Sequence, residues 1–233
     1  MIDGKVLQVN VGVPRSNPAK QLAMTGIDKR PVDRAVYVRA PGPKATGLHS
    51  GLVGDPIGDI KHHGGDDQAV YAYAREDYDW WEEELGRQLA GGAFGENLTT
   101  EGIDVNGALI GEIWRIGDEL ELQPTFGRTP CATFQARMQE PQWLKRFTRE
   151  NRTGAYLRVI TPGHVRAGDP ISIVYRPAKS VSIAEAFGIY MLNPASLGRL
   201  LDAESLPDDL REEVVDRLTR TVPPSSSDPA SPS

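Results

Sequence analysis

The chain contains a single cysteine, Cys131, within the stretch FGRTPCATF. Isolated cysteines are most often small buried hydrophobic residues, so packing is the first interpretation of this thiol. Chemistry is the second, because Pro130 stiffens the backbone beside the thiol and Arg128 supplies a cation for an anionic ligand. A thiolate could act as a nucleophile with a histidine that no spacing identifies, or as a soft ligand for a heavy metal held by an organic cofactor.

Histidines, glycines and aspartates are concentrated in the stretch DIKHHGGDDQAVYAY. His62 and His63 are adjacent, so in a strand they would point to opposite faces, and no third soft ligand stands at a metal-binding spacing. We therefore do not expect a zinc or iron site here. A histidine before Gly64 and Gly65 better suits a loop whose backbone approaches a ligand closely, since glycine permits conformations that a Cβ forbids.

The stretch GGAFGENLTTEGID places Gly95, Glu96 and Asn97 before an apolar residue and two threonines. This order predicts a loop that leads into a strand and carries several hydrogen-bond donors and acceptors. An asparagine-stabilised turn without any ligand would give the same pattern, so this stretch alone supports both interpretations.

Short apolar segments, rich in Val, Ile and Tyr and separated by Gly, Pro and Asp, run from residue 5 to about 176. They predict a β-rich barrel or sandwich that holds the three stretches above. Gly-Asp pairs predict tight turns, and we interpret their aspartates as turn residues and not as catalysts. These pairs are Gly54-Asp55, Gly117-Asp118 and Gly168-Asp169. The predicted strands are KVLQVNVGV, RAVYVRA, QAVYAYA, EIWRIGDELELQ, AYLRVI and ISIVYR.

Two helices are expected to interrupt these strands, over residues 75–90 and 140–151. In the first helix the apolar residues recur at spacings of three and four, which predicts one buried stripe. In the second helix Pro141 suits the first turn. The stripe of the first helix consists of Tyr78, Trp81, Leu85 and Leu89.

After residue 180 the pattern becomes helical. Ser182 and Glu185 predict a capping box for a helix over 182–192, Pro194 begins a second helix and Pro207 a third. Helices this short must pack on one another, on the barrel or on a second subunit, so a homodimer is expected. The chain is thus divided into a barrel domain over 1–177, a three-helix domain over 178–221 and a tail over 222–233. The tail has no apolar residues to offset its ordering entropy and is predicted to be disordered.

Composition narrows the classes of function. The chain has 39% hydrophobic and 25% charged residues, and no apolar run long enough to cross a bilayer. No secretory signal pattern is visible, and one cysteine forms no internal disulfide, so we expect a cytoplasmic protein. The net charge of -6 argues against nucleic acid as a partner. Anionic small molecules stay compatible with it, because local arginines can oppose the overall sign.

Taken together and in this order, the motifs resemble the MOSC domain, the molybdenum cofactor sulfurase C-terminal domain, in its stand-alone YiiM-like bacterial form. The resemblance covers roughly residues 5 to 175, and the three helices that follow are similar to the three-helix domain of that group. The motifs that carry it are MTGIDKRPV, GLVGDPIGDIKHHGGDDQAVYAY, FGENLTTEGID, RIGDELELQ, GRTPCATF and GAYLRVITPGHVRAGDPISI.

The resemblance implies a mainly β, barrel-like fold with a few helices and a small C-terminal three-helix appendage. It also implies a molybdenum cofactor of the molybdopterin type, whose molybdenum is bound by Cys131 as metal ligand and catalytic residue. Arg128 and Thr129 would hold the anionic dithiolene and phosphate side of the cofactor. The cofactor-binding residues implied in this way are Thr25, Arg30, His63, Gly64, Asp67, Asn97, Arg128, Thr129 and Cys131.

One position departs from the family pattern. Thr25 falls where the family often has a Lys-Thr or Lys-Ser pair, and here Met24 stands in the place of the lysine. A phosphate or pterin contact is therefore in doubt, and Lys20, Lys29 or Arg30 could replace it.

The activity implied by the resemblance is the reduction of N-hydroxylated compounds, of the hydroxylamino-purine type, to amines. The chain shows no flavin, haem or iron–sulfur motif, so electrons would come from a partner reductase. Pyridoxal phosphate is not expected, because 233 residues leave no room for the desulfurase domain of the full-length sulfurase. Two alternatives stay open: a carrier or binding module for the cofactor or for sulfur without turnover of its own, and a cofactor-free scaffold.

Overall fold

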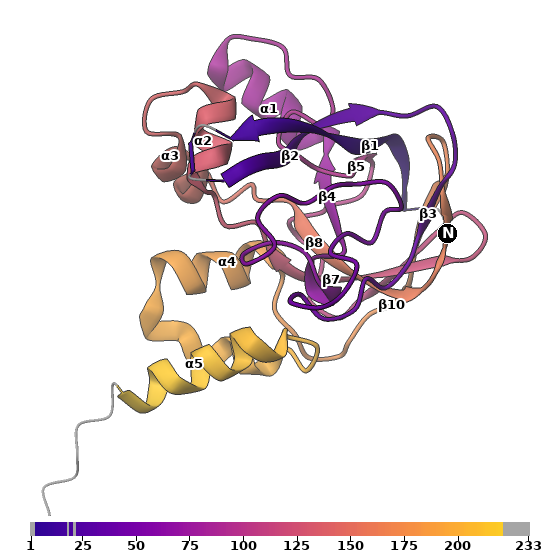
Figure 1. The fold of residues 1–233 in the computed structure, drawn as a ribbon. Coiled ribbons are helices and arrows are strands. Elements are labelled where there is room, and N and C mark those ends of the chain that lie inside the picture. The colour runs from indigo at the N-terminus through magenta and orange to yellow at the C-terminus, as the bar shows by residue number, and fades with distance from the viewer. Residues whose placement is uncertain (1–2, 18, 21, 221–233) are drawn as a thin grey trace, which may run out of the picture.

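Seven strands close into a barrel in the computed structural model, which describes residues 3–17, 19–20 and 22–220 (Figure 1). The strand order around the ring is β10-β6-β7-β8-β4-β5-β1, and β1 pairs again with β10. All of these pairs are antiparallel except β4 with β5. The strands are β1 (Gly4–Asn17), β2 (Leu22–Pro31), β3 (Val36–Val38), β4 (Val70–Ala74), β5 (Leu98–Glu101), β6 (Ile113–Ile116), β7 (Leu120–Gly127), β8 (Ala155–Thr161), β9 (Gly163–Val165) and β10 (Pro170–Tyr175).

The closed ring confirms the predicted barrel and excludes the sandwich. Strand β2 extends the sheet beyond β1, and β3 pairs with β9 in a small separate sheet. The helices are η1 (Asp66–Gln68), α1 (Arg75–Leu85), α2 (Ala132–Met138), α3 (Trp143–Glu150), α4 (Ile183–Leu192), η2 (Pro194–Asp202) and α5 (Asp208–Arg220). No helix of the described ranges is long and apolar enough to span a bilayer.

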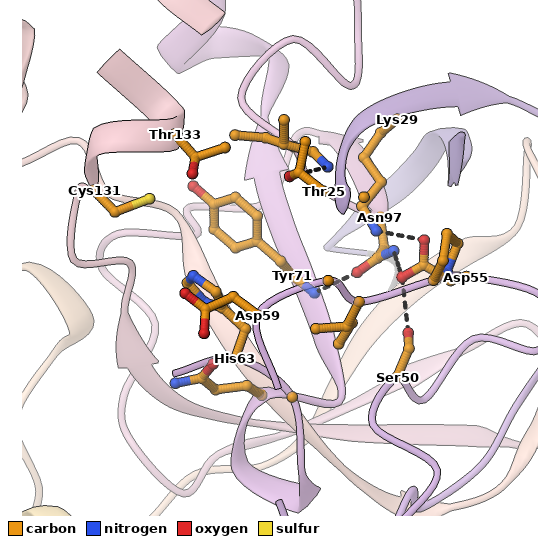
Figure 2. A pocket seen from close by; sticks show the side chains of 18 of the residues that line it. Thr25, Lys29, Ser50, Asp55, Asp59, His63, Tyr71, Asn97, Cys131 and Thr133 are labelled. Atoms are coloured by element: carbon orange, nitrogen blue, oxygen red, sulfur yellow. Dashed lines mark hydrogen bonds and ion pairs between the residues drawn. The ribbon is translucent and has the colours of Figure 1, made fainter. Parts of the chain in front are cut away.

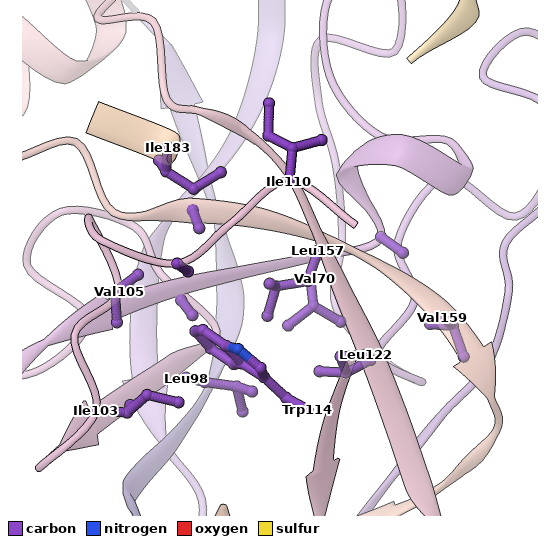
Figure 3. Packing of buried hydrophobic residues seen from close by; sticks show 14 of the residues in the cluster. Val70, Leu98, Ile103, Val105, Ile110, Trp114, Leu122, Leu157, Val159 and Ile183 are labelled. Atoms are coloured by element: carbon purple, nitrogen blue, oxygen red, sulfur yellow. The ribbon is translucent and has the colours of Figure 1, made fainter. Parts of the chain in front are cut away.

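The interior of the barrel is aliphatic and centred on Trp114 (Figure 3). Alternation along β6 explains this position, because Trp114 and Ile116 are buried while Arg115 between them faces solvent. The Trp114 indole N–H donates to the carboxylate of the buried Glu112, so its polar edge is satisfied inside the core. Leu98, Val70 and Leu157, among other apolar side chains, surround it in Figure 3.

A second, aromatic core joins α1, α2 and α3 to one side of the barrel. Phe94 lies near its centre, with ring centroids 4.8 Å from Tyr73 and 5.2 Å from Phe134. Helix α1 ends at Leu85, five residues before the predicted end, because Gly86 adopts the left-handed conformation at φ 63°. Leu89, predicted on the same stripe, is buried after the helix has ended.

The C-terminal helices share the core of the barrel. Buried apolar residues of α4, η2 and α5 belong to the same cluster as the barrel interior, and α4 packs against β7. The Ser182 hydroxyl accepts the N–H of Glu185 at 3.1 Å, as the predicted capping box requires. The second predicted helix is a 3-10 helix. The domain division at residue 177 and the homodimer stay predictions, and the predicted disordered tail lies outside the described residues.

Candidate functional site

A pocket lies where β2, the loop over residues 50–64, the start of β5 and the start of α2 meet (Figure 2). Elements far apart in sequence supply its walls, since the closed barrel brings β2, β4 and β5 together at one end. Six residues expected to bind a cofactor line it: Thr25, His63, Gly64, Asn97, Arg128 and Cys131.

Cys131 stands at the N-cap of α2, with extended backbone at φ -134°. The thiol is free and half-buried, and Figure 2 shows it directed toward the ring of Tyr71 across the pocket. Helix α2 was not predicted from the sequence. Its buried Phe134 and Met138 fix it to the aromatic core, so the position of the thiol depends on that packing.

Arg128 is a buried cation, only 5% exposed, on the same wall as Cys131. Its Nη1 donates to the carbonyl of Phe94, and its guanidinium lies 5.1 Å from the ring centre of Tyr71 and 4.3 Å from that of Phe134. Its Nε has no hydrogen-bond partner. Burial works to lower its pKa, but Tyr156, Tyr71 and Cys131 raise the Arg128 pKa above its ordinary value. The guanidinium is therefore charged, buried and not neutralised by a described carboxylate.

Lys29 is the other buried cation of the pocket, and it forms an ion pair with Asp55. The Asp55 carboxylate also accepts from the Gly12 N–H at 2.7 Å, the Ser50 hydroxyl at 2.8 Å and the Asn97 amide at 3.0 Å. Asp55 closes the predicted turn through its N–H to the Leu52 carbonyl, but its carboxylate also belongs to a buried ion pair that the sequence does not reveal. Gly54 does turn the chain, at φ 89°, but the turn directs the carboxylate inward to a cation 26 positions earlier in the sequence.

Asn97 links this ion pair to the barrel. Its side-chain oxygen accepts the Tyr71 N–H at 3.1 Å, and its amide donates to the Asn10 carbonyl at 3.3 Å. The interpretation of this stretch as a loop leading into a strand is confirmed, because β5 begins at Leu98. Asn97 therefore lines the pocket with both of its polar atoms already engaged.

His63 follows the turn at Asp59 and points into the pocket (Figure 2). Burial, together with the charge on Arg128, lowers the pKa of His63 to about 4. The imidazole is therefore neutral near pH 7 and offers one donor and one acceptor nitrogen. Its neighbour His62 is exposed and binds Asp59 at 2.9 Å. No cluster of three or more metal-ligating residues occurs in the parts of the chain described.

Asp67 and Thr129 lie outside this pocket and line a neighbouring cavity instead. Asp67 forms an ion pair with Arg158 and stands beside Gln68. Cys131 lines both cavities, so Thr129 is close to the thiol without facing the same space as Arg128.

Arg30 lines neither cavity and pairs with the buried Asp28, with 61% of its own side chain exposed. The expectation for Arg30 is therefore not supported, and the two-residue period of β2 explains why, since Thr25, Ile27 and Lys29 face the pocket. Of the three candidates to replace the family lysine, Lys29 alone lines this pocket, and it is already paired with Asp55.

Several lining residues were not predicted as site residues. Tyr71 lies on β4 and Tyr156 on β8; the ring face of Tyr71 approaches Arg128, and the charge of Arg128 also acts on Tyr156. Burial raises the pKa of Tyr156 above its ordinary value, so its phenol keeps its proton near neutral pH. From sequence alone, aromatic residues on strands are predicted to be core residues. No local pattern distinguishes Tyr71 and Tyr156, which line the pocket, from Tyr73, which does not.

Comparisons with known proteins agree with this fold. The MOSC domain model matches residues 59–172. Over 223 residues the chain is 31% identical to the uncharacterized protein YflK of Bacillus subtilis, covering 94% of this chain and 96% of that protein. It is 34% identical over 142 residues to the protein YiiM of Escherichia coli, covering 60% and 62%. A protein of Gibberella moniliformis named reductase is 29% identical over 224 residues, and the chain spans only 38% of its length.

Solved structures match over nearly the whole chain. YiiM from Geobacillus stearothermophilus superposes with a TM-score of 0.73 at 29% identity, covering 92% of this chain and 99% of that one. YiiM from Escherichia coli gives a TM-score of 0.70 at 25% identity, covering 96% of both chains. The chain therefore belongs to the MOSC domain family and groups with its YiiM-like members.

Proposed function

We propose that the protein is a molybdenum-cofactor-dependent oxidoreductase that reduces N-hydroxylated compounds to amines with electrons from an external reductase. The observation that carries this proposal is the pair formed by Arg128 and Cys131 on one wall of the pocket. A buried guanidinium with no carboxylate partner calls for an anion, and a thiol beside it is the ligand that a soft metal takes.

The residues present fit such a cofactor. The unpartnered Nε of Arg128 is the orphaned polar atom that an anionic ligand would satisfy. Gly95, at φ +81°, lets Arg128 pack closely against the backbone, since a Cβ there would stand 2.9 Å from Ile27 Cγ1 and 3.2 Å from Arg128 Nη1. Cys131 would hold the metal, while Arg128 and the neighbouring Thr25 would hold the anionic organic part.

The reduction consumes two electrons and two protons, breaks the N–O bond of the substrate and releases the amine and water. The cofactor, when bound, supplies the redox chemistry at the metal. The chain supplies position, and the two protons come from water. Tyr156 and the neutral His63 both line the cavity around Cys131, where the phenol O–H and an imidazole N–H can donate hydrogen bonds to the substrate oxygen.

We propose that the electrons come from a partner reductase, because no flavin, haem or iron–sulfur motif is visible in the sequence. The protein is accordingly proposed to work in the cytoplasm, where a reductase partner and small N-hydroxylated compounds meet.

The test is metal content. Purified from a host that makes the cofactor, the wild-type protein should contain molybdenum in near-stoichiometric amount, and Cys131→Ala should contain almost none. Arg128→Met should also lose most of it, whereas Arg15→Met, which alters an exposed arginine, serves as the matched control. Equal molybdenum in wild type and Cys131→Ala would overturn the site assignment.

Turnover separates an enzyme from a carrier. The loaded wild-type protein, given a chemical electron donor, should reduce a hydroxylamino-purine to the corresponding aminopurine. Loaded protein that converts no N-hydroxylated compound with any donor would instead support a carrier of the cofactor.

A further inference from the structure

The loop over residues 92–96 contacts both the guanidinium of Arg128 and helix α2, which carries the thiol at its N-cap. The Phe94 carbonyl of the loop accepts the Nη1 hydrogen of Arg128. The Ala93 carbonyl accepts the Nε hydrogen of Arg137 at 2.8 Å, and Arg137 belongs to α2. The conformation of this loop therefore helps to set where the guanidinium and the thiol stand relative to each other.

Glu96 holds this loop from inside the protein. Its side chain is fully buried, and it lines neither cavity. One of its carboxylate oxygens accepts the Gly92 N–H at 2.5 Å and the Thr99 hydroxyl at 2.8 Å. The other accepts the Tyr78 hydroxyl at 2.7 Å, and the oxygen of that hydroxyl accepts the Phe94 N–H at 2.9 Å. The carboxylate thus fixes the loop at two backbone positions, one directly and one through the phenol.

These hydrogen bonds are what makes the burial of Glu96 tolerable. A buried carboxylate without partners is costly, and no cation of the described residues forms an ion pair with this one. Burial raises the pKa of the Glu96 carboxyl above its ordinary value, although the hydrogen bonds from Gly92, Tyr78 and Thr99 act to lower it. Because a carboxylate accepts stronger hydrogen bonds than a neutral group does, the loop that supplies its donors is held in one conformation.

A change in that conformation would reach the candidate site by two routes. The Phe94 carbonyl would move away from Arg128, so the guanidinium would gain freedom inside the pocket. The Ala93 carbonyl would move away from Arg137, so α2 would lose one of its ties to the barrel. Both routes alter the distance between the cation and the thiol.

We propose that Glu96 is a positioning residue of the candidate site: through the loop over residues 92–96 it sets the place of the Arg128 guanidinium relative to the Cys131 thiol. Glu96 itself touches no ligand. The proposal rests on the function proposed above only for the statement that a cofactor binds between these two groups.

The test compares Glu96→Gln with Glu112→Gln. Glu112 is also fully buried, accepts the Trp114 indole N–H at 2.6 Å and the Arg176 Nε hydrogen at 3.1 Å, and lines neither cavity. Both variants leave buried donors without their acceptor, so both should unfold at lower urea concentration than wild type. Only Glu96→Gln should alter the site.

The first measurement needs no cofactor: the His63 pKa is followed by NMR in the full-length protein made without it. The charge of Arg128 lowers this pKa, and a guanidinium that leaves the Phe94 carbonyl for water is screened more strongly. The His63 pKa should therefore rise in Glu96→Gln and stay at its wild-type value in Glu112→Gln. An unchanged or lower pKa in Glu96→Gln, or an equal rise in Glu112→Gln, would refute the positioning role.

Tyr78→Phe examines the same path should Glu96→Gln not fold. It removes the hydroxyl that joins the Glu96 carboxylate to the loop and retains the buried ring. Tyr73→Phe is the matched control, because that hydroxyl lies in the same aromatic core and donates to the Arg152 carbonyl at 2.8 Å. The His63 pKa should rise in Tyr78→Phe and not in Tyr73→Phe, and equal values in the two variants would contradict the proposal.

Molybdenum content is the second measurement. Purified from a host that makes the cofactor, Glu96→Gln should lose most of the molybdenum that wild type contains, and Glu112→Gln should keep it. Equal molybdenum in Glu96→Gln and wild type would overturn the positioning role. A wild-type protein without molybdenum would instead overturn the proposed function, and the His63 pKa would then decide the role of Glu96 by itself.

Discussion

The pocket holds two buried cations, of which Lys29 is paired with a carboxylate and Arg128 is not. Lys29 is 7% exposed and is paired with Asp55, which itself accepts three further hydrogen bonds. Arg128 is 5% exposed; its guanidinium contacts the Phe94 carbonyl and the rings of Tyr71 and Phe134, and no carboxylate of the described residues pairs with it. A buried charge that the fold neutralises serves the fold, whereas one that the fold leaves open is available to a ligand. The contrast separates the side of the pocket that stabilises the fold from the side at which we propose that a ligand binds.

Removing the ion pair between Lys29 and Asp55 should have the largest effect on stability. Asp55→Ala strands the buried Lys29 ammonium and three other donors, so it should lower the free energy of unfolding by about 3–5 kcal/mol. Urea unfolding followed by circular dichroism measures this loss. Lys5→Ala, at an exposed ion pair with Glu101, should change the same quantity by less than about 0.5 kcal/mol and is the control. A similar change in unfolding free energy in both variants would mean that the buried pair contributes no more to stability than the exposed one.

The pH dependence of stability should follow His63. Its pKa is about 4 in the folded protein and about 6.5 in the unfolded chain, so the unfolded state binds the extra proton between these values. Its contribution to stability is complete above pH 6.5 and is lost as pH falls to 4. His63→Gln should therefore reduce the acid-induced loss over this window by about 3 kcal/mol. Unchanged acid sensitivity in that variant would contradict the lowered pKa.

Removing the guanidinium of Arg128 should lower the free energy of unfolding less than Asp55→Ala does. In Arg128→Met the lost ring contacts are offset because the charge no longer has to be desolvated, so unfolding free energy should fall by about 1 kcal/mol or less. A loss as large as that of Asp55→Ala would show that Arg128 is structural.

His63 also reports the charge on Arg128 directly. Burial and Arg128 are the two largest causes of its lowered pKa, whereas Asp59 acts to raise it. Titration by NMR should therefore show the His63 pKa rising in Arg128→Met and falling further in Asp59→Asn. The same pKa in all three proteins would mean that the field of Arg128 is neutralised after all.

The fold could be predicted because its signals are local. Strands such as β4 and β8 are short apolar runs bounded by turn residues, and the Ser182 capping box marks the start of α4. Helix α2 could not be predicted from the sequence. It has only seven residues, and it is stabilised by the packing of Phe134 and Met138 on the aromatic core. Strand β2 was missed because its charged residues, such as Lys29, hide its alternation.

The site was predicted in part, for a related reason. Cys131, Arg128, His63 and Asn97 stand in recognisable motifs and meet in one pocket. The pairing of Lys29 with Asp55 joins positions 26 apart, and only the folded barrel reveals it. Lys29 lines the pocket whereas Arg30 does not, and this difference likewise depends on the register of β2, which no motif specifies.

The barrel closes between β1 and β10, where Gly4 lies opposite Ile171. The strand that completes the ring is therefore the last of the described strands to be synthesised, and its partner is the first. A nascent chain that has reached Tyr156 already holds every lining residue of the first pocket, yet β6 and the start of β1 still lack their common neighbour. Until residue 171 emerges, these open strand edges are free to pair with other chains. The barrel that carries the site can therefore close only after its last strand has been synthesised.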